Sequence, residues 1–500
     1  MRIQLVTTLL CTAASVAGFE PPMAMAQQAG DIQTEKKSFE TKDGNVIEYE
    51  IGTLFVPENR SDPNSRVIGV GFARFPATEP AEVPPVFQLP GGPGSSYVSR
   101  LKSANKGQLE RAFAGRADLS FCDVVLVDQR GFSDYGDKLR ATLRLPARQP
   151  DQPRNLDEML SAFQAFAREA VADFAETDVD LRGYTVKECA HDVADLRKAL
   201  GYDKITLNGT SFGSQWSFAV MRLHPEIVAR ALLSGVEPLN HGYDMPSHVL
   251  AAVRRMWQSV EEDPRFEPYL PEGGMAEAAR VVIERLEAQP LTLELTDRKS
   301  GETKTVGMLG PAEFPWSDPT RILELYHGHT NRFARMTKTE VLSRQTRMTL
   351  IGPLIDSSLG VTPERRYELW TDPATRYLGR RNFAPYLATA DIWPSPDVGD
   401  DFRRPVLCEI PVVFAQGDWD TKTPIENTFE IAPFFINSRV VIAERGGHGV
   451  FGTIANQLPE VWREFVEFQR TGDLDGLPAR VKLKPSRRFA PPKFALAEEE

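Results

Sequence analysis

The sequence predicts an α/β protein: a mostly parallel sheet flanked by helices, with a large, mainly helical insertion. Short apolar runs alternate with helical segments along the chain, which is typical of parallel strands joined by crossover helices. This alternation stops for about 170 residues after Ser234, far more than one crossover needs. The length of 500 residues also exceeds that of one ordinary core.

The first elements expected are an antiparallel strand pair, because residues 47–51 and 68–72 alternate apolar and polar side chains around a turn-rich segment. Buried parallel strands are expected where short, continuous apolar runs follow, and helical segments lie between them. The predicted buried strands are 86–89, 124–127, 204–208, 230–234, 411–416 and 439–443, and the predicted helices are 157–175, 185–200 and 459–468.

The interruption of the strand–helix pattern sets the domain organisation. We expect a signal at 1–26, a core in two parts at 27–239 and 406–480, a cap at 240–405 over the sheet's C-terminal edge, and a tail at 481–500. The cap has predicted elements of its own, such as a helix at 275–288 and a hairpin turning at residues 299–301. The tail is rich in Pro, Lys and Arg, and we expect a loosely held strap without a function.

Residues 1–26 have the features of a secretory signal. Arg2 supplies the positive start, Leu5 to Gly18 is a short apolar run, and Ala24-Met25-Ala26 fits the cleavage pattern. The apolar run is too short to span a bilayer, and the sequence offers no longer one. We therefore expect an exported chain, periplasmic or secreted, that does not insert into a membrane.

Charge and cysteine use exclude some classes of protein. A formal net charge of −11 and a pI near 5.4 argue against nucleic acid as a main partner. Cys122, Cys189 and Cys408 leave two alternatives open: one disulfide with one free thiol, or three buried thiols. His327 and His329 lack a third ligand at suitable spacing, so we interpret them as packing or surface residues and expect neither metal nor cofactor.

A G-x-S-x-G stretch, Gly209 to Gly213, places Ser211 between a β-branched run and a segment with helical spacing. Strand, tight turn and helix form the setting of a nucleophile elbow, where small residues let the hydroxyl stand clear of the backbone. The five-residue pattern alone also occurs in ordinary glycine-rich turns. A nucleophilic Ser211 therefore requires a base, an acid and oxyanion donors elsewhere in the chain.

The expected base is His448, which lies in a glycine-flanked loop directly after a predicted strand. That position is the carboxyl edge of the sheet, where loops carry chemistry, and a neutral imidazole there can accept the serine proton. His191 and His224 lie on the helices before and after the elbow and are expected to point away from it. The remaining four histidines lie in or beside the cap.

The acid should follow the preceding strand, where the sequence offers Asp418 and Asp420 and gives the chain order Ser, Asp, His. We favour Asp420, because Asp418 stands close to the strand end and can bond the amides of its own turn. Glu237, after an earlier strand, is a third candidate. The carboxylate would fix the tautomer of His448 and stabilise its protonated form.

Oxyanion donors are expected in the loop from Pro90 to Gly94, which follows the strand at 86–89. Its prolines and glycines make a stiff loop whose free amides can point inward without side-chain obstruction. The second expected donor is the backbone N–H of Phe212, the residue after the nucleophile.

Together, these segments resemble a known family. The stretches "LPGGPGSS", "VDQRGFSDYG", "NGTSFGSQW", "GDWDTKTP" and "GGHG" are similar, in the same order over about residues 45–470, to the α/β-hydrolase serine peptidases of the proline iminopeptidase and tripeptidyl aminopeptidase group. The resemblance implies the α/β-hydrolase fold, with a cap inserted before the strand that precedes the acid. By position it also implies the following roles: Ser211 as nucleophile, Asp420 as acid, His448 as base, Gly92 and Phe212 as oxyanion donors, and Asp128 and Arg130 as braces of the loop beside the site.

The sequence departs from the family in two places. Pro90 stands where many iminopeptidases have histidine, which fits the tripeptidyl branch, and Phe132-Ser133 replace the usual small residues after "DQRG". In the family, acidic residues of the cap hold the free amino group of the substrate. No motif in this sequence places those residues.

Three functions compete. The first is an exported serine aminopeptidase that cleaves N-terminal proline or short peptides. The second is a carboxylic ester hydrolase with the same triad, because fold and triad serve peptides and small esters alike. The third is a non-catalytic binding protein on this fold, and the intact set of Ser, Asp, His and oxyanion loop argues against it.

Overall fold

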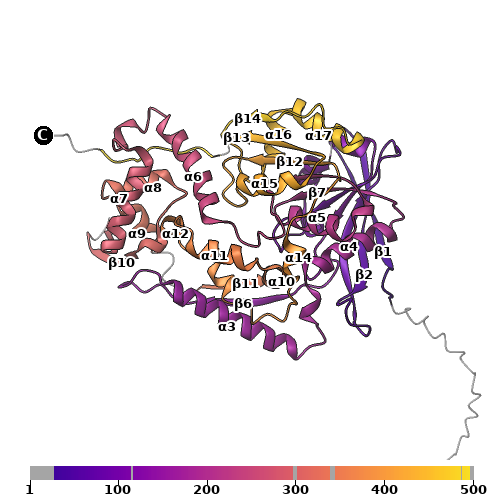
Figure 1. The fold of residues 1–500 in the computed structure, drawn as a ribbon, viewed down its shortest axis with the longest axis horizontal. Coiled ribbons are helices and arrows are strands. Elements are labelled where there is room, and N and C mark those ends of the chain that lie inside the picture. The colour runs from indigo at the N-terminus through magenta and orange to yellow at the C-terminus, as the bar shows by residue number, and fades with distance from the viewer. Residues whose placement is uncertain (1–26, 114–115, 297–300, 338–343, 486, 496–500) are drawn as a thin grey trace, which may run out of the picture.

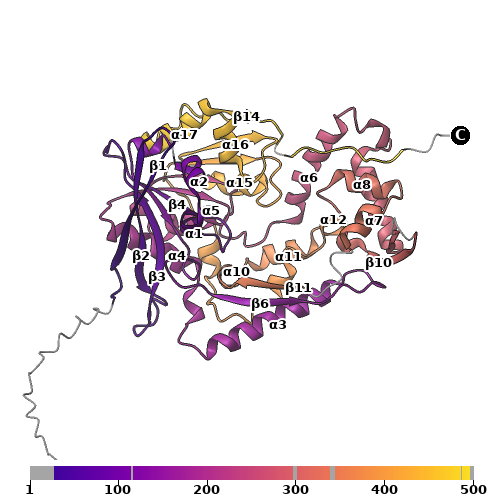
Figure 2. The same cartoon turned by 180° about the vertical axis from the view of Figure 1, so that it is seen from behind.

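The computed structural model describes residues 27–113, 116–296, 301–337, 344–485 and 487–495. The predicted export signal and most of the predicted turn at 299–301 lie outside these residues. A core built on a sheet and a cap built mainly of helices lie side by side, joined by several chain segments (Figures 1 and 2).

Ten strands form the sheet of the core, in the order β1-β2-β3-β5-β4-β7-β8-β12-β13-β14. Their bounds are β1 Ile32–Glu40, β2 Val46–Pro57, β3 Val67–Phe75, β4 Val86–Leu89, β5 Val124–Val127, β7 Ile205–Thr210, β8 Val228–Ser234, β12 Val412–Gly417, β13 Ser438–Glu444 and β14 Arg480–Lys482. From β1 to β5 the neighbours run antiparallel, and from β5 to β14 they run parallel. The predicted mostly parallel sheet is confirmed, whereas β1 and β14 were not predicted.

Helices cover both faces of the sheet because successive strand residues point to opposite sides. Phe87 and Val125 pack towards α4 and α5, whereas Val86 and Val124 pack towards α1 and α2. Further along the same second face, α16 and α17 cover β12 and β13. The helices of the core are α1 Tyr97–Ser103, α2 Lys106–Phe113, α4 Val186–Ala199, α5 Phe212–Leu223, α15 Ile425–Ile431, α16 Val450–Gln457 and α17 Pro459–Thr471.

The cap has an apolar core of its own, built mainly from α6, α7, α8 and α9. The elements of the inserted segment are α6 Pro246–Glu261, α7 Gly274–Ala288, β9 Leu291–Thr296, β10 Thr303–Leu309, α8 Pro319–Tyr326, α9 Asn331–Thr337, β11 Arg344–Thr349, α10 Ile351–Leu359, α11 Pro363–Thr371, α12 Thr375–Leu378, α13 Ala384–Leu387 and α14 Asp400–Arg403. Of these, α10 and α14 pack against the apolar cluster of the main sheet. Strands β9 and β10 pair antiparallel, as predicted. No described helix has the length and apolar character needed to cross a membrane.

One earlier segment lies with the cap rather than with the main sheet. Strand β6, Arg140–Leu145, pairs antiparallel with β11 of the cap, and α3, Leu156–Ala175, packs along β6. Figure 2 shows this layer along one side of the molecule, between core and cap. The sequence break at residue 240 does not reveal this layer, because β11, the partner of β6, comes about 200 residues later in the chain.

The three described cysteines settle the disulfide question. Cys122 and Cys189 are buried and Cys408 is half-buried, and all three carry free thiols. The alternative with one disulfide is therefore wrong for this structure.

Candidate active site

The turn at Ser211 has the geometry of a nucleophile elbow. Ser211 lies between the end of β7 and the start of α5 with φ 59° and ψ −132°, a region that non-glycine residues rarely adopt. Its N–H donates to the carbonyl of Ser234 at 3.0 Å, which holds the turn on β8. A β-carbon on Gly209 would lie 2.2 Å from the carbonyl oxygen of Gly213, so this close approach requires glycine.

The predicted base and acid meet beyond the ends of neighbouring strands. Nδ1 of His448, in the loop after β13, lies 2.9 Å from Oδ2 of Asp420, in the loop after β12. Asp420 is 1% exposed, and its carboxylate also accepts hydrogen bonds from Thr423 Oγ1 at 2.8 Å and from the Lys422 N–H at 2.8 Å. These contacts fix one carboxylate oxygen behind the imidazole, which leaves Nε2 of His448 for proton transfer.

Asp420 also changes the proton affinity of the imidazole. Burial lowers the pKa of His448, but the hydrogen bond and the charge of Asp420 outweigh burial, so the pKa lies above its ordinary value. The site thereby favours the protonated form of this imidazole.

Ser211 and His448 approach each other across Gly235. A β-carbon on Gly235 would lie 3.0 Å from Cε1 of His448 and 3.1 Å from the amide nitrogen of Ser211. Within the described residues, Ser211 Oγ makes no hydrogen bond to His448. Catalytic hydrogen bonds often shorten only when substrate binds, so this arrangement suits a free enzyme.

The other two candidate acids have different partners. Oδ1 of Asp418 accepts the N–H of Arg445 at 2.6 Å, and Arg445 itself has φ 62° in the loop that leads to His448. Asp418 therefore braces the base loop and does not contact the imidazole. The N–H of Glu237 donates to Ser214 Oγ at 3.0 Å, and its carboxyl lies near Asp420 rather than on His448.

The predicted oxyanion donors are free to bind a ligand. In the described part of the chain, neither the Gly92 N–H nor the Phe212 N–H donates a hydrogen bond, and the latter opens the first turn of α5, where no intrahelical acceptor exists. Gly91 comes closest to the nucleophile, since a β-carbon there would lie 3.6 Å from Ser211 Oγ. The glycines of this loop therefore let the backbone reach the serine.

The brace of the oxyanion loop is Gln129, which the sequence analysis missed. Its Nε2 donates to the carbonyl of Gly91 at 3.0 Å, and its Oε1 accepts the N–H of Gly94 at 2.6 Å. Asp128 accepts from Ser96 Oγ at 2.6 Å at the start of α1, just after the loop. Burial raises the pKa of Asp128 to about 6.

Within the described residues, Arg130, the other predicted brace, makes no hydrogen bond to the oxyanion loop and anchors the segment to which it belongs. Its guanidinium is fully buried and bonds Asp192 of α4 through Nε at 2.7 Å and Nη2 at 2.6 Å. It also donates to the carbonyls of Glu58 and Gly183, both at 2.6 Å. Arg130 therefore ties α4 to the end of β2. From the sequence alone, neighbours in "DQRG" cannot be told apart, because adjacent loop residues point in different directions.

Three carboxyls gather beside the triad, and no motif identified them. Burial, together with the charges of Asp244, Asp356 and Asp420, raises the pKa of Glu237 well above its ordinary value. Burial raises the pKa of Asp244 and of Asp356 to about 7 in each case. Asp244 accepts from Asn427 Nδ2 at 3.0 Å. We call Glu237, Asp244 and Asp356 the acidic cluster.

Four of the other histidines have partners away from the triad. His191 Nδ1 lies 2.9 Å from His224 Nε2, on the two helices that flank the elbow. His327 Nε2 lies 2.9 Å from the carbonyl of Tyr269, and His329 stacks on the ring of Phe494 in the C-terminal tail. Among the residues that the structure describes, no group of three or more His, Cys, Asp or Glu side chains could hold a metal ion.

The comparisons with known proteins agree with the observed sheet. A family model for the α/β hydrolase fold matches residues 84–266, which include the oxyanion loop and the elbow. The chain therefore has the α/β-hydrolase fold that the sequence predicted, and fold and match support a hydrolytic enzyme. They do not single out the aminopeptidase group.

Solved structures of similar shape are enzymes of several kinds. A thermophilic esterase from Thermogutta terrifontis has 16% identity and a TM-score of 0.34, with 84% of this chain and 99% of that chain covered. A bromoperoxidase from Bacillus anthracis has 13% identity and a TM-score of 0.34, with 83% of this chain and 99% of that chain covered. The 2-hydroxy-6-oxo-6-phenylhexa-2,4-dienoate hydrolase of a Rhodococcus strain has 13% identity and a TM-score of 0.34, with 88% and 99% covered. At these TM-scores they say nothing about the substrate of this chain, and no curated protein matches it.

Proposed function

We propose that this protein is an exported serine aminopeptidase that cleaves proline or short peptides from N-termini through an acyl-enzyme. The proposal is supported by the acidic cluster, Glu237, Asp244 and Asp356, which lies within electrostatic reach of the acid Asp420. Burial raises the pKa of all three half-buried carboxyls, and the charges of Asp244 and Asp356 raise that of Glu237 further, so a cation bound there would stabilise their charged forms. The free ammonium of a peptide N-terminus is such a cation, whereas a neutral ester has none.

In the proposed reaction, Oγ of Ser211 attacks the carbonyl carbon of the scissile bond while His448 Nε2 takes the hydroxyl proton. Asp420 holds the imidazole by its Nδ1 and stabilises the imidazolium, and the Gly92 and Phe212 N–H groups receive the developing oxyanion. His448 then donates the proton to the leaving amine. Water, activated by the same imidazole, hydrolyses the acyl-enzyme and restores the serine.

The acidic cluster assigns a direction to the substrate. In a peptide whose ammonium binds the cluster while Ser211 attacks a nearby carbonyl, the amino group and the acyl carbonyl would belong to the same fragment. The enzyme would therefore release one residue or a short peptide from the N-terminus, according to the distance from the cluster to Ser211.

The test compares matched substrates. A panel of aminoacyl and tripeptidyl fluorogenic amides is measured beside their N-acetylated twins and short-chain p-nitrophenyl esters. We expect free-amine amides to be preferred over their acetylated twins. Asp244→Asn should raise KM for the free-amine amides by about 10- to 100-fold, as expected for losing a hydrogen bond to a charged group. KM for the esters should not change, and their hydrolysis should change only in its pH profile, because the charge of Asp244 helps to raise the pKa of His448.

The control is Glu364→Gln, because Glu364 is an exposed acid on α11. This substitution should change KM neither for the free-amine amides nor for the esters. Rapid ester hydrolysis without preference for a free amine would favour the carboxylic ester hydrolase instead. A protein that turns over neither class and does not react with a fluorophosphonate would be the binding protein.

Export is a separate part of the proposal and rests on the signal features of residues 1–26. N-terminal sequencing of secreted or periplasmic protein should begin near Gln27. Recovery of the chain from the cytosol with Met1 intact would contradict export and leave the catalytic proposal standing.

A further inference from the structure

The C-terminal strap, residues 483–485 and 487–495, starts beside the loop of the catalytic base. Strand β14 pairs with the last residues of β13, Ile442 to Glu444, and the Leu483 N–H donates to the carbonyl of Glu444 at 3.1 Å. β13 leads directly into the loop of His448. The expectation of a loosely held tail is therefore wrong at its start, where the tail is the last strand of the sheet.

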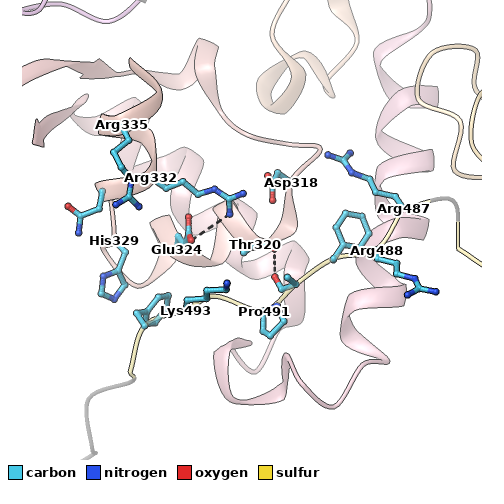
Figure 3. A pocket seen from close by; sticks show the side chains of 14 residues that line it. Asp318, Thr320, Glu324, His329, Arg332, Arg335, Arg487, Arg488, Pro491 and Lys493 are labelled. Carbon is cyan, nitrogen blue, oxygen red and sulfur yellow. Dashed lines mark hydrogen bonds and ion pairs between the residues drawn. The ribbon is translucent and has the colours of Figure 1, made fainter. Parts of the chain in front are cut away.

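Beyond the sheet the strap crosses to the cap, where three residues hold it (Figures 1 and 3). The carbonyl of Ala490 accepts from Thr320 Oγ1 at 2.5 Å, as the dashed line in Figure 3 shows, and the ring of Phe494 stacks on His329 with centroids 3.9 Å apart. Phe489 packs against the apolar core of the cap. An open cavity of about 810 Å³ lies between the strap and the cap, and these three strap residues are part of its lining.

Trp419 connects the cap to the loop of the catalytic acid. It lies between Asp418 and Asp420 in the chain, yet its ring is 6% exposed and belongs to the apolar core of the cap. Among the described residues, all other buried members of that core come from 249–378. The backbone N–H of Trp419 donates to the carbonyl of Gly446 at 2.9 Å, and this bond ties the acid loop to the base loop.

Strap and acid loop meet inside the cap. The rings of Trp419 and Phe489 lie 6.3 Å apart at an angle of 41°. A second contact holds the same loop, because Arg255 of α6 donates to the carbonyl of Asp418 at 2.6 Å. Movement of the cap away from the core would expose both aromatic rings or pull the acid loop with it.

We propose that Trp419 is a positioning residue, which with Phe489 of the strap couples the placement of the cap to the alignment of Asp420 behind His448. This inference rests on the roles proposed for Asp420 and His448, and it does not depend on the substrate class. Displacement of a catalytic group by about 1 Å can cost about 100-fold in rate. The strap is then a functional element, since it holds the cap in the position at which the acid loop is aligned.

The test uses Trp419→Ala, Trp419→Phe and Phe489→Ala, with Phe333→Ala as the matched control. Phe333 is an equally buried aromatic in the cap core, on α9. All variants are assayed well below their melting temperatures. The first readout is the rate of Ser211 labelling by a fluorophosphonate as a function of pH, which needs no peptide or ester substrate.

We expect Trp419→Ala to label up to about 100-fold more slowly, with a shifted pH profile, and Trp419→Phe to recover most of the rate. Phe489→Ala should act in the same direction, and the double variant should lose less than the product of the single losses. Phe333→Ala should lower only the melting temperature. Equal pH profiles for Trp419→Ala and Phe333→Ala, or strictly multiplicative losses, would overturn the inference.

A second readout is independent of catalysis. The low-field proton resonance of the His448 Nδ1–H that faces Asp420 should be shifted or broadened in Trp419→Ala and retained in Phe333→Ala. A wild type that does not react with the fluorophosphonate would count against the proposed function, while this resonance would still decide the positioning role. An unchanged resonance in Trp419→Ala would refute that role.

Discussion

The two sides of the site are built differently. On the core side, Ser211, Asp420 and His448 each follow the end of a strand, β7, β12 and β13, and the parallel register brings these ends to one edge. On the cap side, Asp244 lies in the loop before α6 and Asp356 lies on α10. These two residues do not lie at the ends of neighbouring strands, so the pairing of the sheet does not fix their positions.

This difference separates reaction from recognition. The core groups would act on any acyl substrate, because the same sheet edge positions nucleophile, base and acid together. The cap carboxyls would act only on substrates that carry a positive charge near the scissile bond. Substitutions of the core groups should therefore affect every substrate alike, and substitutions of the cap carboxyls should change KM for free-amine substrates alone.

The largest effect is expected from Ser211→Ala. Removal of the nucleophile should lower kcat by about 10⁶ on every substrate, by analogy with serine peptidases, and abolish fluorophosphonate labelling. Ser217→Ala is the control, because Ser217 Oγ donates to the Gly213 carbonyl at 2.7 Å inside α5 and should leave labelling intact. Equal labelling of wild type and Ser211→Ala would place the reactive group elsewhere.

The next effect compares the two neighbouring aspartates. Asp420→Asn should lower kcat by about 10⁴ with little change in melting temperature, because the imidazole loses its orienting carboxylate. Asp418→Asn should cost about 1 kcal/mol of stability and leave most of the turnover, since Asp418 only braces the loop at Arg445. A folded but inactive Asp418→Asn or Glu237→Gln would show that the acid has been assigned wrongly.

The pH dependence of KM should distinguish substrate binding by the cap carboxyls from catalysis by the core groups. The pKa of Asp244 and of Asp356 is raised to about 7, so both lose their negative charge as the pH falls below about 7. A free α-amino group loses its positive charge above about pH 8. KM for a free-amine amide should therefore be lowest between about pH 7 and 8 and rise on both sides.

Esters and N-acetylated amides should lack that minimum in KM. For all substrates kcat/KM should fall together at low pH, because His448, whose pKa is raised, must be neutral to act as base. The measurement is a set of kcat and KM profiles for one amide, its acetylated twin and one ester. A minimum in KM for the acetylated twin would contradict recognition by the acidic cluster.

The smallest effect is expected from Gln129→Ala. Loss of its bonds to Gly91 and Gly94 should loosen the oxyanion loop and lower kcat by about tenfold on all substrates. This loss is smaller than the roughly 10²- to 10³-fold loss of kcat that follows removal of an oxyanion donor, because both donors remain in Gln129→Ala. Gln164→Ala, which loses a bond to a carbonyl near α13, should keep the wild-type kcat.

The core could be predicted because its signals are local. Apolar runs located β4, β5 and β12, and the distance from the strand end was enough to prefer Asp420 over Asp418. Strand β1 was not predicted, because its sequence, "IQTEKKSFE", is exposed on both sides over most of its length and shows no alternation of apolar and polar residues. The side-chain pattern of a buried strand depends on a few consecutive residues, so each of these strands could be predicted from its own segment.

The parts that could not be predicted depend on contacts between distant segments. Gln129 braces a loop that lies about 35 residues earlier, and β6 pairs with a strand of the cap. The attachment of Phe489 and Phe494 depends on a cap whose surface no local pattern defines. For the same reason the acidic cluster became visible only when loop and helix were placed together.

The two outer strands of the described sheet bear on the solubility of the protein. One is β14, which is only three residues long, and the other is β1, whose exposed middle carries Glu35, Lys36 and Lys37. A free strand edge offers unpaired N–H and carbonyl groups to a neighbouring molecule, and a short or highly charged edge is a poor template for such pairing. A ten-stranded sheet with these borders is protected against edge-to-edge aggregation at high concentration.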